Sequence, residues 1–203
     1  MSPTLAPSPY RFSLAVYCGS RPGAHPAYQA LAQTVGQWIG QHGGQLVYGG
    51  GNNGLMGVVA NATHAAGGRV VGIIPHALVG KEVAKEDCDE LLVVDNMHQR
   101  KAMMAERADA FLVIPGGIGT LEEMFEVWTW RQLGYHNKPI GLLNTHGFFD
   151  GLLAFMDHTV KQGFLSPAQL ELVEFSQDPL ALLAKLTHFI AHNKISQIAV
   201  NEI

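Results

Sequence analysis

The sequence is poor in cysteine, with only Cys18 and Cys88 among its 203 residues. The two lie far apart in the chain, and neither belongs to a Cys-x-x-Cys pair or to a zinc-binding spacing. These facts argue against a disulfide framework and against a structural zinc site. Sparse, unpaired cysteines are typical of a reducing compartment, so we expect the protein to act in the cytoplasm.

Positive charge and long apolar runs are also scarce. Lys and Arg number 13 against 17 Asp and Glu, for a net charge of −4, whereas proteins that bind nucleic-acid polymers usually carry a basic face. No apolar run approaches the ~20 residues that span a bilayer. The opening, MSPTLAPSPYRF, lacks the apolar core of a secretory signal. We expect neither a nucleic-acid polymer nor a membrane as partner, and we interpret residues 1–10 as a flexible arm.

What the sequence does contain is a regular alternation of short apolar runs and longer helical stretches. Strands are predicted at residues 12–17, 45–48, 69–74, 91–94, 110–114, 139–143 and 172–175. Helices are predicted at residues 26–41, 55–66, 97–107, 120–133, 148–162 and 179–192, and residues 76–90 form a loop with at most one helical turn. This order predicts an α/β fold, with a doubly wound, mainly parallel sheet flanked by helices. We assign residues 11–193 to this single domain and residues 194–203 to a C-terminal tail.

The first glycine-rich loop follows the predicted strand at residues 45–48. Gly49, Gly51 and Gly54 satisfy the pattern G-x-G-x-x-G between a strand and a helix, where backbone N–H groups can approach a phosphate. A dinucleotide site also needs an acidic residue about 20 positions on, at the end of the next strand. The first acid after the loop is Glu82, beyond that strand, so NAD is disfavoured. Close packing at a tight turn explains one or two of these glycines equally well.

The second glycine-rich loop, at residues 115–123, reads Pro-Gly-Gly-Ile-Gly-Thr-Leu-Glu-Glu and again joins an apolar strand to a helix. One interpretation is structural: Thr120 and Glu123 have the spacing of a capping box, in which Thr120 caps the helix and no catalytic group is present. Three glycines in four positions before the cap favour a second interpretation, in which exposed N–H groups face an anion.

A third segment, Met-His-Gln-Arg-Lys at residues 97–101, places two cations at the start of a predicted helix. The helix dipole disfavours positive charge there, which favours a functional role for the two cations. The planar guanidinium of Arg100 suits phosphate or carboxylate recognition. The alternative is a solvated Arg-Lys pair on an exposed turn.

Taken together, these segments resemble the Lonely Guy family, the cytokinin-activating nucleotide hydrolases. The family hallmark P-G-G-x-G-T-x-x-E is complete at residues 115–123, and the Met-His-x-Arg-Lys segment matches at its usual spacing. The resemblance covers roughly residues 12–190. Further matches are Cys18-Gly19-Ser20, Tyr48 to Gly51, Gly54-Leu55-Met56-Gly57 and Thr129-Trp130.

The resemblance implies a Rossmann-like fold, a homodimer and a reaction. That reaction cleaves the N-glycosidic bond of a nucleoside 5′-monophosphate, with an N6-modified adenine as the base in cytokinins, and needs no metal or cofactor. By similarity, Arg100 and Glu123 are the catalytic pair. The residues implied to bind substrate are Glu82, Lys101, Gly116, Gly117, Ile118, Gly119, Thr120, Leu121, Glu122, Thr129, Gly19, Ser20, Gly50 and Gly51.

Glycosidic cleavage passes through an oxocarbenium-like state, in which positive charge grows on the ribose. We hypothesise that Glu123 stabilises this charge and orients water, while Arg100 keeps Glu123 ionised. Asn52-Asn53 and Met103 depart from the residues usual in the family, so the preferred base stays open. Members are often labelled lysine decarboxylases, but the sequence offers no lysine context for pyridoxal phosphate.

Three other functions remain open. The nearest is a nucleosidase that acts on purine or pyrimidine nucleoside monophosphates in general. The second is a non-catalytic nucleotide-binding protein, which would bind ligand without releasing a base. A NAD-dependent enzyme is third, because the acidic residue after the third strand is missing.

Overall fold

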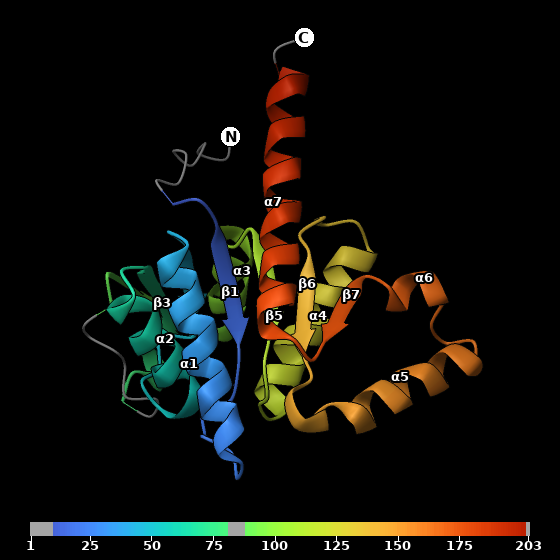
Figure 1. Cartoon of the computed structure of the whole chain (residues 1–203), viewed down its shortest axis with the longest axis horizontal. Helices are drawn as coiled ribbons and strands as arrows, with labels where there is room; N and C mark the ends of the chain where they lie inside the picture. Colours follow the sequence, from blue (N-terminus) through green and yellow to red (C-terminus); the bar gives the residue numbers. More distant parts are fainter. Residues whose placement is uncertain (1–9, 81–87, 202–203) are drawn as a thin grey trace.

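The computed structural model describes residues 10–80 and 88–201, with side chains as far as His192. The part of the chain so described contains a seven-stranded sheet in which all neighbouring strands are parallel (Figure 1). Helices cover both faces, which confirms the predicted α/β fold. The strands are β1 (Ser13–Tyr17), β2 (Gln45–Tyr48), β3 (Arg69–Pro75), β4 (Glu90–Val94), β5 (Ala110–Val113), β6 (Ile140–Leu143) and β7 (Val173–Ser176).

The strand order is β4-β3-β2-β1-β5-β6-β7. The chain therefore builds outward from β1 to β4, returns to pair β5 with β1, and then builds outward in the other direction. The reversal of direction between β1 and β5 is a topological switch point, and in such sheets ligands bind beyond the carboxyl ends of the strands there. The loops that follow β1 and β5 are Cys18-Gly19-Ser20 and Pro115-Gly116-Gly117. The fold thus brings these two predicted motifs to one place.

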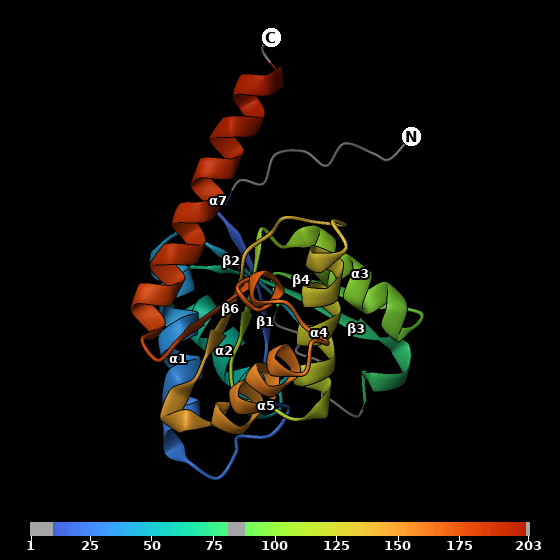
Figure 2. The ribbon, with the colours of Figure 1, turned by 90° about the vertical axis from the view of Figure 1, so that its right-hand side faces the viewer.

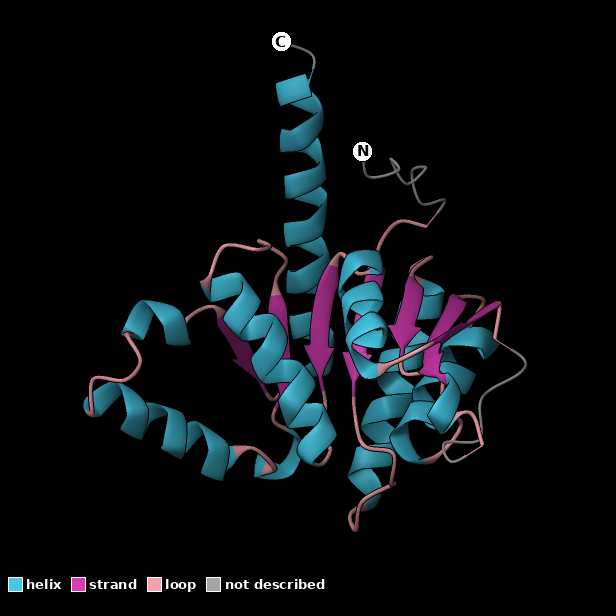
Figure 3. Ribbon diagram, turned by 180° about the vertical axis from the view of Figure 1, so that it is seen from behind, coloured by secondary structure: helices cyan, strands magenta, loops and turns pink. Residues whose placement is uncertain are grey.

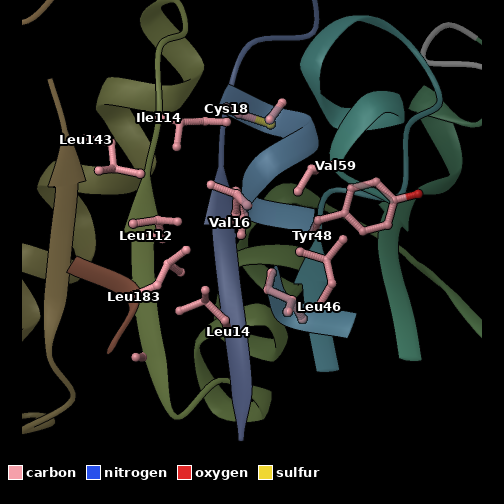
Figure 4. Close-up of a cluster of buried hydrophobic side chains, with 14 of the residues drawn as sticks. Leu14, Val16, Cys18, Leu46, Tyr48, Val59, Leu112, Ile114, Leu143 and Leu183 are labelled. Carbon is pink, nitrogen blue, oxygen red and sulfur yellow. The ribbon is translucent and has the colours of Figure 1, made fainter. Parts of the chain in front are cut away.

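One face of the sheet is covered by α1 (Pro26–Gln41), α2 (Gly54–Ala65) and α7 (Pro179–Asn201) (Figure 1). Their apolar side chains share a core with alternate residues of the central strands. Figure 4 shows part of this core, where Leu14 and Val16 of β1 lie between Leu46 of β2 and Leu112 of β5. These strand residues are at most 2% exposed. Their continuous apolar character follows from burial on both faces of a parallel sheet.

The opposite face is covered by α3 (Met97–Arg107), α4 (Ile118–Gln132) and α5 (Asp150–Lys161), as seen from behind in Figure 3. A second core forms here from buried residues of these helices and the other set of strand side chains. The short helix α6 (Pro167–Leu170) is tied to α4 because the Trp128 indole donates a hydrogen bond of 2.9 Å to the Gln169 carbonyl.

Most predicted elements agree with the structure to within one or two residues, and the differences have local causes. Helix α7 continues to Asn201 rather than ending at His192, since no glycine or proline follows to end it, and its last turns project from the sheet (Figure 2). The short elements η1 (His76–Leu78), η2 (Thr145–Gly147) and α6 are too brief for a periodic signal. Residues 1–9 of the predicted arm lie outside the described residues. Among those described, no helix is both long and apolar enough to cross a membrane.

Candidate active site

A cavity of about 700 Å³ opens at the switch point. Its walls come from the loop after β1, the starts of α2 and α3, the first two turns of α4 and the segments after β3 and β6. The predicted site residues that line it are Gly19, Ser20, Arg100, Gly116, Gly117, Ile118, Gly119, Thr120, Glu122 and Glu123. The fold therefore gathers into one cavity residues that are widely separated in the chain.

The loop after β1 is fixed to both neighbouring loops. The Gly19 N–H donates to the Pro115 carbonyl at 3.1 Å, and the Leu55 N–H donates to the Gly19 carbonyl at 3.0 Å. Gly54 has a left-handed φ of 56°, and a Cβ there would collide with the backbone of Ser20 and Arg21. Only glycine satisfies both conditions, so Gly54 is a structural residue that supports the cavity wall.

The glycine turn after β5 leaves the amino end of α4 open to the cavity. The N-cap residue is Gly117, which has no side chain to cap the helix, and α4 begins at Ile118 rather than at Thr120. Thr120 lies inside the first turn and is 3% exposed. The capping-box interpretation of this segment is therefore wrong. Nothing lies within 4 Å of a Cβ built at Gly117 or Gly119, and both residues line the cavity. A helix start with uncapped N–H groups is a ready anion site.

Arg100 reaches the cavity from the first turn of α3, whose N-cap is Asn96. Its side chain is not a solvated cation, because the residue is only 5% exposed and Nη2 donates to the Gly49 carbonyl at 2.8 Å. A Cβ at Gly49 would collide with that same Nη2 atom. The first glycine of the G-x-G-x-x-G pattern therefore makes room for a guanidinium. Gly49, Gly50 and Gly51 do not line the cavity.

Lys101 does not line the cavity and joins α3 to α4. Its Nζ atom donates to Glu122 Oε1 at 2.6 Å and to Glu126 Oε1 at 2.9 Å, and the side chain is 11% exposed. Burial works against the protonated amine, but the hydrogen bonds to the two glutamates outweigh it and raise the pKa of Lys101. Lys101 thus stays charged and balances the charge of Glu122 at the cavity wall.

Glu123 lines the cavity from the second turn of α4 and is half-buried. Its carboxylate lies near the end of β1, since burial and the charge of Glu123 together raise the pKa of both Tyr17 and Cys18. A Cys18 thiol with a raised pKa is not a nucleophile at neutral pH. The acidic group of the cavity floor is therefore the candidate for chemistry, rather than the cysteine beside it.

The remaining predicted site residues lie elsewhere. Gly50 packs against β3, and Gly51 is buried and does not line the cavity. Leu121 packs against the second core, and Thr129 is exposed farther along α4. Glu82 lies outside the described residues.

Several residues that line the cavity carry no predicted role. They are Arg21, Pro22, Gly23, Ala24, Tyr28, Leu55, Met56, Leu78, Met97 and Phe148. Most are apolar and carry no chemical signature of their own. Their position after β1, β2, β3, β4 and β6 is the signal that could have found them, and using it requires the strand order.

Fold and site together define a class: a Rossmann-like α/β protein whose cavity joins an uncapped helix start, a buried arginine and a half-buried glutamate. Two solved structures share the fold. The Moco carrier protein of Chlamydomonas reinhardtii has a TM-score of 0.66 at 20% identity and covers 89% of this chain and 98% of its own. The molybdenum cofactor binding protein of Rippkaea orientalis has a TM-score of 0.68 at 22% identity and covers 90% and 99%.

Sequence comparison then identifies the family. The family model described as possible lysine decarboxylase matches residues 56–186. The cytokinin riboside 5′-monophosphate phosphoribohydrolase LOG3 of Arabidopsis thaliana is 44% identical over 90% of this chain and 86% of its own. The probable cytokinin riboside 5′-monophosphate phosphoribohydrolase LOGL5 of Oryza sativa subsp. japonica is 47% identical over 86% of this chain and 71% of its own. This chain belongs to the Lonely Guy family.

Proposed function

We propose that the protein hydrolyses the N-glycosidic bond of N6-modified adenosine 5′-monophosphates and releases the free base and ribose 5-phosphate. One observation carries the proposal: Arg100 and Glu123 share a cavity with the open amides at the start of α4. A cavity of about 700 Å³ lies within the range for small-molecule sites. Relatives that are 43–47% identical are named as enzymes of this reaction, which supports it further.

In this proposal the substrate phosphate binds the N–H groups of Gly117 to Thr120, where the dipole of α4 favours an anion. Ser20 and Gly19 close the same end of the cavity, because their loop is bonded to Pro115. Phosphate binding supplies position rather than chemistry, since it fixes the ribose relative to Glu123. Glu122 forms part of the cavity wall, and Lys101 supports it through their ion pair.

The chemistry falls to Glu123. As the bond from C1′ to the base breaks, its electron pair leaves with the base and positive charge develops on the ribose. The Glu123 carboxylate stabilises that charge and orients the water whose oxygen bonds to C1′. The proton lost by the water passes through Glu123 to the departing base. Arg100 keeps Glu123 ionised and is itself held in place by the Gly49 carbonyl.

A lysine decarboxylase activity finds no support in the described residues, despite the description of the family model. A Schiff-base lysine needs a lowered pKa. The pKa of Lys101, the lysine beside the cavity, is raised by its two glutamate partners. Lys138 has a pKa lowered by burial, but its Nζ donates to the Ala105 and Glu106 carbonyls near the start of β6, at the opposite edge of the sheet.

A panel of substrates tests the proposal. We expect base release from AMP and faster release from isopentenyl-AMP, measured by chromatography. Adenosine should be cleaved at least about a hundredfold less efficiently, because it lacks the phosphate that anchors the ribose. Equal rates for AMP and isopentenyl-AMP would indicate a general nucleotide nucleosidase. Binding of every nucleotide without base release would show a non-catalytic protein, and equal rates for AMP and adenosine would contradict the phosphate site.

We further propose that the protein is a cytoplasmic homodimer. Large apolar side chains are exposed on the α4 and α5 side of the sheet, where Tyr135 is 77% and Phe155 60% exposed. Covering them against a second copy would remove apolar surface from water. Light scattering of the purified protein should give twice the chain mass of 21.9 kDa, and Phe155→Glu should shift it toward the monomer. A monomer in the unmodified protein would contradict the dimer.

A further inference from the structure

Arg21 lines the cavity with an arginine side chain. It follows Ser20 in the loop after β1, and its backbone is held against Gly54, where an added Cβ would collide. The neighbouring Gly19 N–H is bonded to the Pro115 carbonyl, directly before the glycine turn. The loop that carries Arg21 is thus fixed beside the uncapped start of α4.

Within the described part of the chain, the charged groups of the cavity wall are Arg21, Arg100, Glu122 and Glu123. Arg100 is buried and donates to the Gly49 carbonyl, and Glu122 is paired with Lys101. The Arg21 side chain is exposed and, among residues 10–80 and 88–192, makes no ion pair or hydrogen bond. Arg21 is therefore a cation at the phosphate end of the cavity that is available to a ligand.

A 5′-phosphate near neutral pH carries close to two negative charges, whereas backbone amides offer only partial charges. A guanidinium can donate two parallel hydrogen bonds to phosphate oxygens, which are stronger than bonds to neutral donors. We propose that Arg21 binds the substrate's 5′-phosphate and determines the preference for nucleotides over nucleosides. This inference rests on the proposed function and adds a specificity-determining residue to it.

The test compares Arg21→Gln and Arg21→Lys with the unmodified protein. For Arg21→Gln we expect KM for AMP to rise about 10- to 100-fold, the range for a lost charged hydrogen bond, with kcat changed less than about threefold. Selectivity for AMP over adenosine should fall by the same factor, and so should inhibition by ribose 5-phosphate. Arg21→Lys should recover part of each loss, because it keeps the charge but not the planar fork.

Arg11→Gln is the matched control, since Arg11 is exposed before β1, at the opposite edge of the sheet. It should leave KM for AMP within about twofold of normal. An unchanged KM for AMP in Arg21→Gln, or equal losses for AMP and adenosine, would overturn the inference. The second outcome would mean that Arg21 supports the loop rather than binding phosphate.

A binding measurement separates this inference from the proposed function. If the unmodified protein releases no base, calorimetric titration with ribose 5-phosphate still reports on Arg21. Weaker binding to Arg21→Gln than to Arg11→Gln would then support the phosphate contact while the hydrolase proposal fails. Equal binding to the two variants, or no binding to the unmodified protein, would overturn the role of Arg21.

Discussion

Glu123→Gln should lower kcat for AMP about a thousandfold while Kd for AMP stays within about threefold. The amide has nearly the same shape as the carboxylate, but it cannot stabilise the positive charge on the ribose or take a proton from water. The groups that hold the phosphate lie in the glycine turn and are untouched by this change. Single-turnover base release and calorimetric binding of AMP measure the two quantities separately.

Glu171→Gln serves as the control for this prediction. Glu171 is exposed at the end of α6 and does not line the cavity, so the same substitution there should leave kcat within about twofold of normal. A Glu123→Gln variant with a near-normal rate would refute the catalytic role of that carboxylate. Loss of AMP binding in parallel with the rate would show instead that Glu123 supports the cavity.

Removing the Arg100 guanidinium is expected to lower both the catalytic activity and the free energy of unfolding. Arg100→Ala removes a charged hydrogen bond to a buried carbonyl, which contributes about 1.5–3 kcal/mol. For a chain of this size the melting temperature should fall by about 3–12 °C. Turnover should drop at least about a hundredfold, because the cavity that holds Glu123 loses a buried positive charge. Calorimetric melting and base release from AMP measure both effects.

Gly49→Ala tests the same guanidinium without removing it. The added Cβ would collide with Arg100 Nη2, so the variant should lose activity although both catalytic side chains remain. Gly151→Ala is the matched control, since no atom lies within 4 Å of a Cβ there and the residue is exposed at the start of α5. Normal activity in Gly49→Ala would mean that the position of Arg100 is not critical.

The sequence predicted the layers and the order of elements because a parallel sheet buried on both faces leaves continuous apolar runs. Strand β2 and helices α1 and α3 begin and end where their patterns begin and end. Helix α4 begins earlier than predicted because Gly117 serves as its N-cap without a side-chain bond. Signals based on capping side chains cannot detect such a start.

The candidate site could be predicted only in part. The glycine turn, Arg100 and Glu123 belong to motifs with distinctive residues, and the fold gathers them at one cavity. Tyr28 and Phe148 reach the same cavity because β1 and β6 both flank β5, which no local pattern reveals. The pattern also could not show that Lys101 faces two glutamates rather than the cavity, since that depends on how α3 packs against α4.

A crystal structure of the Glu123→Gln variant with AMP tests the central claim most directly. The account predicts the phosphate on the amides of Gly117 to Thr120 and the ribose C1′ facing the side chain of residue 123. A phosphate bound elsewhere, or a ribose out of reach of residue 123, would contradict the proposed active site.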